Sequence, residues 1–137
     1  RFESWEMSYA LVLGLGAAAR YAMEVGLETA RDRARALASR ARERLAEVPG
    51  VRVLDRGAEL CAIVTAQPGG RDGQEIKLAL RARGINTSSP ERSDAVIDMD
   101  AKGAASALRV SPHYYNTPAE IDTAVAALTE ILALPHR

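Results

Sequence analysis

The sequence predicts an α+β fold, in which a small, mainly antiparallel sheet is covered by helices on one face and preceded by a long apolar helix. Helical periodicity comes first and last along the chain, whereas short strand patterns dominate the middle, giving the order α-α-β-β-α-β-β-α. The length of 137 residues suits one domain, and a hydrophobic fraction of 47% is sufficient for a core.

The first predicted helix covers residues 4–25 and has apolar residues on all sides. They include Trp5, Tyr9, Leu11, Leu13, Leu15, Ala18, Tyr21 and Ala22. A helix of this kind is normally enclosed by other layers, so we expect a partner to cover it. Gly14 and Gly16 suit close packing against its backbone, and Gly26 is the predicted C-cap.

The second predicted helix covers residues 27–47 and has an apolar stripe at three- and four-residue spacing. The stripe consists of Leu27, Ala30, Ala34, Leu37, Ala41, Leu45 and Val48. The arginines that lie off the stripe alternate with acids, and they are Arg31, Arg35, Arg42 and Arg44. Because interleaved acids oppose nucleic-acid binding, we expect a solvated charged face, and Pro49-Gly50 ends the helix.

The middle of the chain changes to strand patterns bounded by turn residues. The expected strands cover residues 51–54, 60–66, 85–87, 95–99 (as an edge strand) and 107–111. A helix at 74–82, stopped by Gly84, separates the second from the third, and residues 88–106 are otherwise loop. The final helix begins with Thr117 as N-cap, Pro118 in its first position and Glu120 closing a capping box.

Composition excludes several classes of function. The formal net charge is zero, which argues against a nucleic-acid-binding protein. The one cysteine, Cys61, cannot form an internal disulfide and is expected to be buried and inert in its strand. A reducing, cytoplasmic location is the corresponding expectation. The N-terminal residues lack a secretory-signal pattern, and the uncharged run at 7–19 is too short to span a membrane.

Two local patterns have a structural interpretation that we prefer to a functional one. Residues 14–19 imitate the Gly-x-Gly-x-x-Ala dinucleotide fingerprint, yet no second strand is predicted before residue 51. The acids Asp94, Asp98 and Asp100 resemble part of a calcium loop but lack its glycine and glutamate continuation. We therefore expect neither a dinucleotide site nor a metal site.

The most distinctive stretch is residues 108–117, Leu-Arg-Val-Ser-Pro-His-Tyr-Tyr-Asn-Thr, in which Arg109 lies between apolar residues at a strand end. A partly buried guanidinium normally has a fixed anionic partner, and its planar fork matches a carboxylate at two points. That partner is either a ligand or an acid of the same domain, and the spacing alone leaves the two alternatives equal.

Residues 109–122, Arg-Val-Ser-Pro-His-Tyr-Tyr-Asn-Thr-Pro-Ala-Glu-Ile-Asp, resemble the C-terminal part of class V aminotransferase-fold enzymes. Residues 1–6 resemble the segment that leaves the large domain in one branch of that family, and residues 48–51 and 60–65 resemble the first two strands of its small domain. The resemblance covers essentially the whole chain. It implies an interdomain helix at 1–26 and a small C-terminal domain at 27–137, without the large domain that binds pyridoxal 5′-phosphate (PLP).

The resemblance further implies a homodimeric PLP-dependent lyase or transferase that acts on an amino acid or a cysteine conjugate. In the family, the arginine at the position of Arg109 binds the substrate α-carboxylate, and Asn86, Ser111 and His113 would lie near the mouth of the active site. No catalytic residue, nucleic acid or membrane partner is expected. The isolated chain is expected to hold no PLP and to be inactive.

Departures from the family pattern limit the functions that the resemblance implies. The Schiff-base lysine belongs to the large domain, and Lys77 and Lys102 are expected to be surface charges. Trp5-Glu6 stands where the family often has Gly-Thr, so no phosphate contact is assigned. The loop at 88–106 has no cysteine, which disfavours a persulfide-carrying desulfurase.

The leading interpretation is a C–S lyase, similar to the ergothioneine-type sulfoxide lyases and the isopenicillin N epimerase-like branch. An epimerase or aminotransferase of the same family is the alternative within the class. A non-catalytic, stand-alone α+β binding module is the alternative from a different class.

Overall fold

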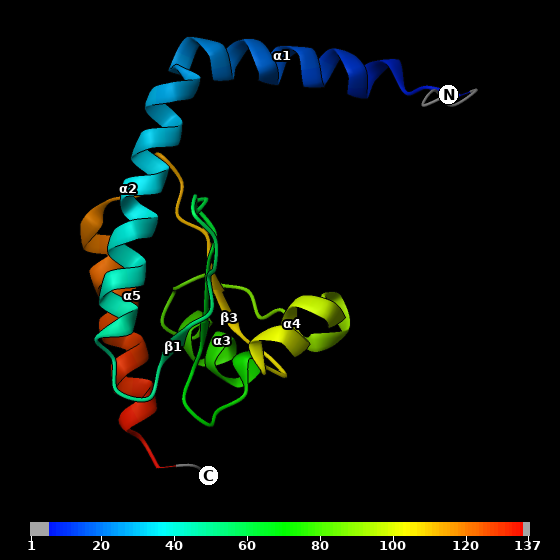
Figure 1. Ribbon diagram of the computed structural model, residues 1–137. Helices are drawn as coiled ribbons and strands as arrows, with labels where there is room; N and C mark the ends of the chain where they lie inside the picture. Colours follow the sequence, from blue (N-terminus) through cyan, green and yellow to red (C-terminus); the bar gives the residue numbers. More distant parts are fainter. Residues whose placement is uncertain (1–5, 136–137) are drawn as a thin grey trace.

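The computed structural model describes residues 6–135 and has the predicted α+β architecture (Figure 1). Its elements are α1 (Tyr9–Val25), α2 (Leu27–Ala46), β1 (Arg52–Val53), β2 (Val64–Gln67), α3 (Gly73–Arg81), a 3-10 turn (Arg92–Asp94), α4 (Val96–Lys102), β3 (Leu108–Val110) and α5 (Pro118–Ala133). The first helix, predicted from residue 4, begins at Tyr9. Residues 1–5, which carry most of the first family-like segment, lie outside the described residues.

In the described residues the sheet has three strands in the order β1-β2-β3, and it is antiparallel as predicted, with fewer strands than the five expected. Helices α2, α3 and α5 pack on the face to which Val64, Ala66 and Leu108 point. The core residues that these helices supply include Leu37, Ala41, Leu45, Ile76, Leu80, Ile121, Leu128 and Ile131. Full burial of one large apolar side chain contributes about 1.5–3 kcal/mol, so this one face provides most of the driving force for folding.

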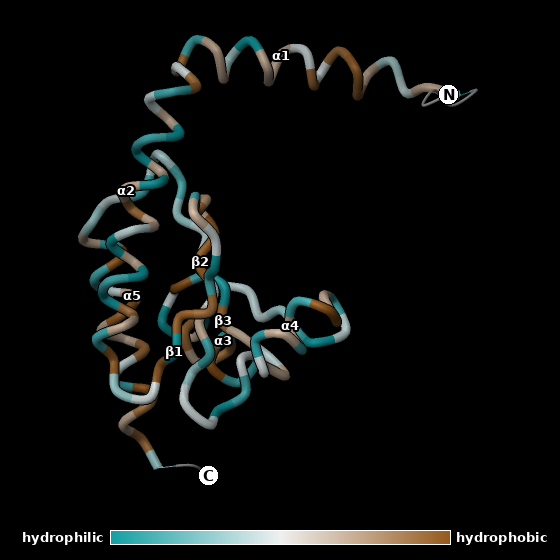
Figure 2. The backbone as a smooth tube through the Cα atoms, viewed as in Figure 1, coloured by the Kyte–Doolittle hydropathy of each residue, from teal (hydrophilic) through white to brown (hydrophobic). Residues whose placement is uncertain are grey.

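Helix α1 leaves the rest of the chain at Gly26, where α1 and α2 meet at an angle of 76° (Figure 1). Gly26 has φ of 92°, a conformation that favours glycine, and its N–H donates to the carbonyl oxygens of Ala22 and Met23, as expected of a C-cap. No residue of α1 is buried, although hydrophobic segments run along it (Figure 2). The predicted covering partner of α1 is therefore not supplied by residues 6–135.

In the described residues, no single helix is both long and apolar enough to cross a membrane. Only α1 and α2 taken together, across their bend, have the length and composition of a span.

Helix α4 corrects the prediction of an edge strand at residues 95–99. It packs on the face of the sheet opposite α2 and α5 (Figure 1), where Met99 is buried with Leu54, Ala104 and Ala107. The adjacent apolar pair Val96-Ile97 suggested a strand, but Ile97 is 89% exposed. Met99 is the buried residue of α4, and its long-range contacts anchor this helix on the sheet.

The strand predicted at residues 60–66 begins only at Val64, and this also corrects the burial of Cys61, which is exposed. Arg42 of α2 is the physical reason. Its guanidinium Nη2 donates to the carbonyl oxygens of Cys61, at 2.7 Å, and of Ile63, at 2.9 Å. These acceptors are thereby removed from sheet pairing. Arg42 itself, predicted on a solvated face, has a side chain that is only 13% exposed.

The brief strand predicted at 85–87 is displaced along the chain, because pairing with the free edge of β3 runs from Ser88 to Glu91. Ser88 is opposite Arg109 and Glu91 is opposite Ser106. Between them, the N–H of Ala107 donates to the carbonyl oxygen of Pro90. Proline has no N–H to return this bond, so the ladder is interrupted and the segment remains two isolated bridges.

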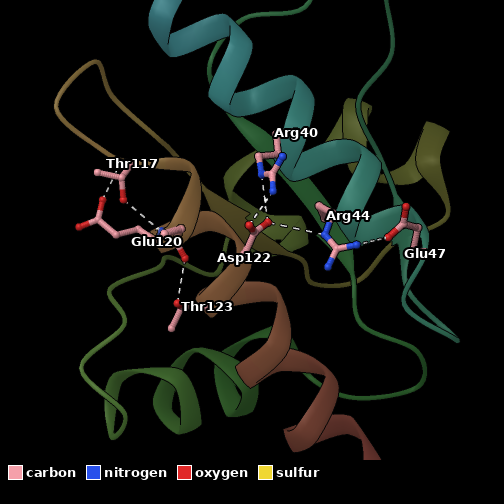
Figure 3. A network of polar contacts seen from close by, with 8 residues as sticks. Arg40, Arg44, Glu47, Thr117, Glu120, Asp122 and Thr123 are labelled. Carbon is pink, nitrogen blue, oxygen red and sulfur yellow. Dashed lines mark hydrogen bonds and ion pairs between the residues drawn. The ribbon is translucent and has the colours of Figure 1, made fainter.

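Helix α5 starts as predicted, with Thr117 and Glu120 in a capping box (Figure 3). The Thr117 N–H donates to Glu120 Oε2 at 2.7 Å, and the Glu120 N–H donates to Thr117 Oγ1 at 3.2 Å. Further along, Arg40 of α2 donates to both carboxylate oxygens of Asp122, at 3.0 and 2.6 Å. This hydrogen-bonded guanidinium holds the pKa of Asp122 below its ordinary value.

Candidate functional site

The part of the second sheet face that α4 leaves open carries a row of polar side chains. Thr65 of β2 is opposite Arg109 of β3, which in turn is opposite Ser88. Directly opposed residues in antiparallel strands point to the same face. Because Val64 and Leu108 face the core, the three polar side chains point away from it, and Arg109 is exposed rather than partly buried as predicted.

The hydrogen bonds of the backbone define the spacing in this row. Arg109 and Ser88 exchange both backbone bonds, at 2.7 and 3.0 Å, which places their Cα atoms about 5.5 Å apart. Thr65 directs its N–H to Asp55 Oδ1 and its carbonyl oxygen to the Leu54 N–H, both away from β3. Thr65 and Arg109 are therefore a non-hydrogen-bonded pair, the arrangement in which Cα atoms approach to about 4.5 Å.

The guanidinium of Arg109 has no acidic partner among residues 6–135. Of the two alternatives that the sequence left open, an acid of the same domain finds no support in this part of the chain. An exposed arginine on a regular strand presents its fork to any anion that reaches the open face.

A brace formed by the partly buried ion pair of Arg42 and Asp55 fixes the Thr65 end of the row. Arg42 Nε lies 2.7 Å from Asp55 Oδ2, and the two side chains are 13% and 9% exposed. The other carboxylate oxygen, Asp55 Oδ1, accepts bonds from the Thr65 N–H at 2.9 Å and from Thr65 Oγ1 at 2.6 Å. The brace links α2, the 55–63 segment and β2, so the strand next to Arg109 is held from outside the sheet.

The other predicted site residues divide into two groups. Asn86 and Ser111 are exposed, and the alternation of side chains along the two segments puts them on the same side as Ser88 and Arg109. His113 lies elsewhere, in the turn before α5, where its ring is 4.7 Å from that of Tyr114. The sequence thus indicated three residues that share the open face and one that does not.

His113 lines a separate cavity of about 340 Å³ beneath the bend between α1 and α2. Tyr21 and Val25 of α1 form one wall, and Tyr114 lies opposite. A hydrogen bond with Tyr21 raises the pKa of Tyr114 above its ordinary value. These residues therefore connect α1 to the turn that follows β3, and they place His113 beside α1 rather than beside Arg109.

Sequence reasoning missed Thr65 and Ser88, the two neighbours of Arg109. Thr65 was inside a predicted strand, but its pairing partner depends on register, which the local pattern does not give. Ser88 was assigned to a loop, and its pairing with Arg109 spans 21 residues (109 − 88). The alternation of residues 86–89 between the two faces was the only available signal.

The two lysines lie on separate helices, α3 and α4. Lys77 Nζ donates to Gln74 Oε1 at 3.1 Å on the outside of α3. Lys102 ends α4, rather than lying in a loop, and its Nζ lies 2.7 Å from Asp98 Oδ2 with the side chain 13% exposed. Both side chains are thus engaged within their own helices.

The two other local patterns are structural. No group of three or more potential metal ligands occurs within residues 6–135. Asp94 accepts the backbone N–H of Glu91, and Asp100 pairs with Arg92 at 2.5 Å, so these acids stabilise the turn before α4. Residues 10–13, which a dinucleotide fingerprint would require as a strand, belong to helix α1.

Comparisons with known proteins agree on one family. The sequence profile of aminotransferase class-V proteins matches residues 1–124. The chain is 30% identical to "Probable cysteine desulfurase 1" of Mycobacterium leprae over 131 residues, covering 96% of this chain and 21% of that protein. It is 28% identical to a cysteine desulfurase of Synechococcus elongatus, again over 96% of this chain and 21% of that protein. The chain thus spans about a fifth of the length of these relatives.

Solved structures show the same fold. A cysteine desulfurase from Escherichia coli matches with a TM-score of 0.85 and 25% identity, over 95% of this chain and 32% of that one. A cystine C–S lyase in complex with cysteine persulfide matches with a TM-score of 0.73 and 21% identity, over the same shares of the two chains, which is a likeness of fold alone. With nine-tenths of its residues inside the matching profile, the chain belongs to the aminotransferase class-V family.

Proposed function

We propose that residues 27–137 are the small C-terminal domain of a PLP-dependent C–S lyase acting on an amino acid or a cysteine conjugate. In this proposal, residues 1–26 lead into the domain from a large domain, and Arg109 binds the α-carboxylate of the substrate. The observation that carries the proposal is the Arg109 guanidinium, which lies on an open sheet face with no acidic partner in residues 6–135.

Arg109 would contribute by holding the substrate carboxylate in one position. Its backbone is fixed on both sides, by Ser88 through two hydrogen bonds and by β2 through the strand register. A carboxylate bound at two points by such a guanidinium has a fixed direction relative to the sheet. Fixing the carboxylate also fixes the bonds at Cα, and correct orientation is a large part of what an enzyme contributes to rate.

PLP would be held by residues outside this chain, because neither Lys77 nor Lys102 fits the cofactor. We therefore assign to this chain the binding and orientation of substrate and no step of the chemistry. Loss of Arg109 should raise KM more than it lowers kcat, since the carboxylate is the same in the ground state and the transition state.

The surface of α1 supports an interdomain position for this helix. Its exposed apolar side chains are Tyr9, Leu11, Val12, Leu13, Leu15, Tyr21 and Met23. An apolar patch of this extent is rare on a free surface and is typical of an interface. We propose that a large domain covers α1, and that the complete enzyme is a cytoplasmic homodimer.

A cysteine desulfurase is the second candidate, favoured by the names of the curated relatives and by the exposure of Cys61. Against it, the segment 88–106 that precedes the arginine strand has no cysteine. The two candidates differ in whether sulfur is transferred to the protein. A desulfurase of the persulfide-carrying kind transfers it to a cysteine thiol of the enzyme, whereas a lyase does not require such a thiol.

The test uses protein expressed from the complete reading frame that contains this chain. Release of sulfide and keto acid is measured with cysteine, cystine and S-substituted cysteines, together with protein-bound persulfide. We expect Arg109→Ala to raise KM at least about a hundredfold, as loss of a two-point charged contact implies. Arg81→Ala, an exposed arginine at the end of α3, is the matched control.

Equal kinetics for Arg109→Ala and Arg81→Ala would contradict the proposed role of Arg109. Cys61→Ala separates the two candidates. With cysteine as the substrate, a lyase keeps its activity and shows no persulfide in either form, whereas a desulfurase that uses Cys61 loses both persulfide and turnover.

A further inference from the structure

We propose that Ser88 is a second substrate-binding residue, whose hydroxyl donates a hydrogen bond to the same carboxylate that Arg109 binds. The inference rests on the proposed function of Arg109 and extends it to a composite site. The site would consist of one guanidinium and one hydroxyl on neighbouring strands, and its ligand would be the α-carboxylate of an amino acid or its conjugate.

The backbone holds Ser88 and Arg109 together directly. Arg109 N–H donates to the Ser88 carbonyl oxygen at 2.7 Å, and Ser88 N–H donates to the Arg109 carbonyl oxygen at 3.0 Å. In such a pair the side chains emerge on the same face from Cα atoms about 5.5 Å apart. An arginine side chain is longer than this spacing, so its guanidinium can lie alongside the serine hydroxyl.

The hydroxyl of Ser88 is free to bind a ligand. Ser88 is half-buried, and its side chain has no hydrogen-bond partner within residues 6–135. On the other flank of Arg109, the hydroxyl of Thr65 already donates to Asp55 at 2.6 Å. Of the two hydroxyls next to Arg109, the structure therefore leaves only Ser88 as an available donor.

The two residues next to Ser88 in the sequence do not share its position on the face of Arg109. Thr87 and Ser89 also carry hydroxyls, but both hydroxyl oxygens are buried and lack a partner in the described residues. Thr87 lines a small apolar cavity beside Val110, on the core side of the sheet. Because side chains alternate between the two faces, Ser88 is the one residue of these three whose hydroxyl lies on the face of Arg109.

The chemistry of the two groups is complementary. A carboxylate that accepts two parallel bonds from a guanidinium still has a free lone pair on each oxygen. A hydroxyl donates one bond to such an oxygen, and bonds to charged acceptors are stronger than bonds between neutral groups. Ser88 therefore strengthens the site without adding charge.

The experiment measures binding by calorimetry, using protein from the complete reading frame. The probe is 3-(methylthio)propionate, which has a carboxylate but neither an amino group nor a free thiol, so no covalent chemistry with the cofactor contributes. We expect Ser88→Ala to weaken its binding roughly tenfold and Arg109→Ala roughly a hundredfold or more. Ser88→Thr, which keeps the hydroxyl, should restore most of the affinity. Ser39→Ala is the control, because Ser39 hydrogen-bonds Glu43 on the exposed side of α2.

The outcomes separate this inference from the proposed function. If Arg109→Ala abolishes binding while Ser88→Ala behaves like Ser39→Ala, the role of Ser88 is wrong and that of Arg109 stands. If neither Arg109→Ala nor Ser88→Ala changes the affinity, the carboxylate site itself is wrong, and both proposals fail. A tenfold loss in Ser88→Ala that Ser88→Thr restores supports the composite site.

Discussion

The brace between Arg42 and Asp55 should dominate the stability of the sheet edge that neighbours the candidate site. Replacing Asp55 with alanine removes the partner of an arginine that is 13% exposed, together with the acceptor of the Thr65 N–H and hydroxyl. Removing one member of a buried ion pair costs about 3–5 kcal/mol. Because the pair is partly buried and Arg42 keeps its bonds to two backbone carbonyls, we expect the lower end, about 3 kcal/mol.

This cost corresponds to a large change in melting temperature. The unfolding entropy near 60 °C is about 2 cal/mol/K per residue, so a loss of about 3 kcal/mol lowers Tm by roughly 10 °C in a chain of 137 residues. Urea unfolding followed by circular dichroism gives the free energy of unfolding directly. Amide exchange of Thr65 adds a local measurement, since its N–H loses its acceptor.

Asp122→Ala is the matched control, because Asp122 also pairs with an arginine of α2 but in solvent. The Arg40 and Asp122 side chains are 44% and 36% exposed, and exposed pairs contribute little to stability. A double-mutant cycle should therefore give strong coupling between Arg42 and Asp55 and weak coupling between Arg40 and Asp122. Equal losses in Asp55→Ala and Asp122→Ala would refute the reasoning that burial makes the difference.

Three further predictions concern α3 and α5. Gly73→Ala should destabilise the protein by about 1–3 kcal/mol, because the added Cβ would lie 2.5 Å from the Ala107 carbonyl oxygen. Urea unfolding tests this, with Gly14→Ala as the control because no atom lies within 4 Å of the Cβ added there. Thr117→Ala should cost about 1 kcal/mol by removing the N-cap, and Thr117→Ser should recover most of it in the same assay. The backbone hydrogen bond from Thr117 lowers the pKa of Glu120. The ionised carboxylate therefore stabilises the folded protein at pH values above the ordinary pKa of a glutamate. This stabilisation is lost as the pH falls through the lowered pKa of the folded state. The fall in Tm between pH 5 and 3 should accordingly be smaller in Glu120→Gln, and an unchanged fall would show that Glu120 does not contribute.

Elements whose signals are local were predictable from the sequence. The capping box of α5 and the apolar stripe of α2 involve residues close together in the sequence. Helix α2 begins and ends within two residues of expectation, and α5 begins at the predicted residue. The start of β2 was not predictable, because it depends on Arg42, which lies 21 residues before Ile63 and binds its carbonyl oxygen. Helix α4 likewise depends on the burial of Met99 against Leu54, a contact that no local pattern contains.

The candidate site divides in the same way. Arg109 was recognisable, because an arginine between apolar strand residues is unusual and the surrounding residues resemble a known family. Its neighbours were not, because they follow from strand register, which two segments decide together. His113 follows Arg109 closely in the sequence, but closeness in sequence does not imply closeness on the sheet. The turn after β3 carries His113 to Tyr21 of α1 instead.

The single-glycine joint at Gly26 has a consequence for how insertions would be tolerated. One extra residue near the end of α1 would rotate that helix about its own axis by about 100° relative to α2. In α2, whose buried residues form one stripe, such a rotation would turn charges into the core. In α1, apolar side chains occur all round, so every rotation presents a similar surface. The direction in which α1 projects is therefore specified by one residue, while its rotational phase is specified only near its C-terminal end, where Tyr21 contacts Tyr114.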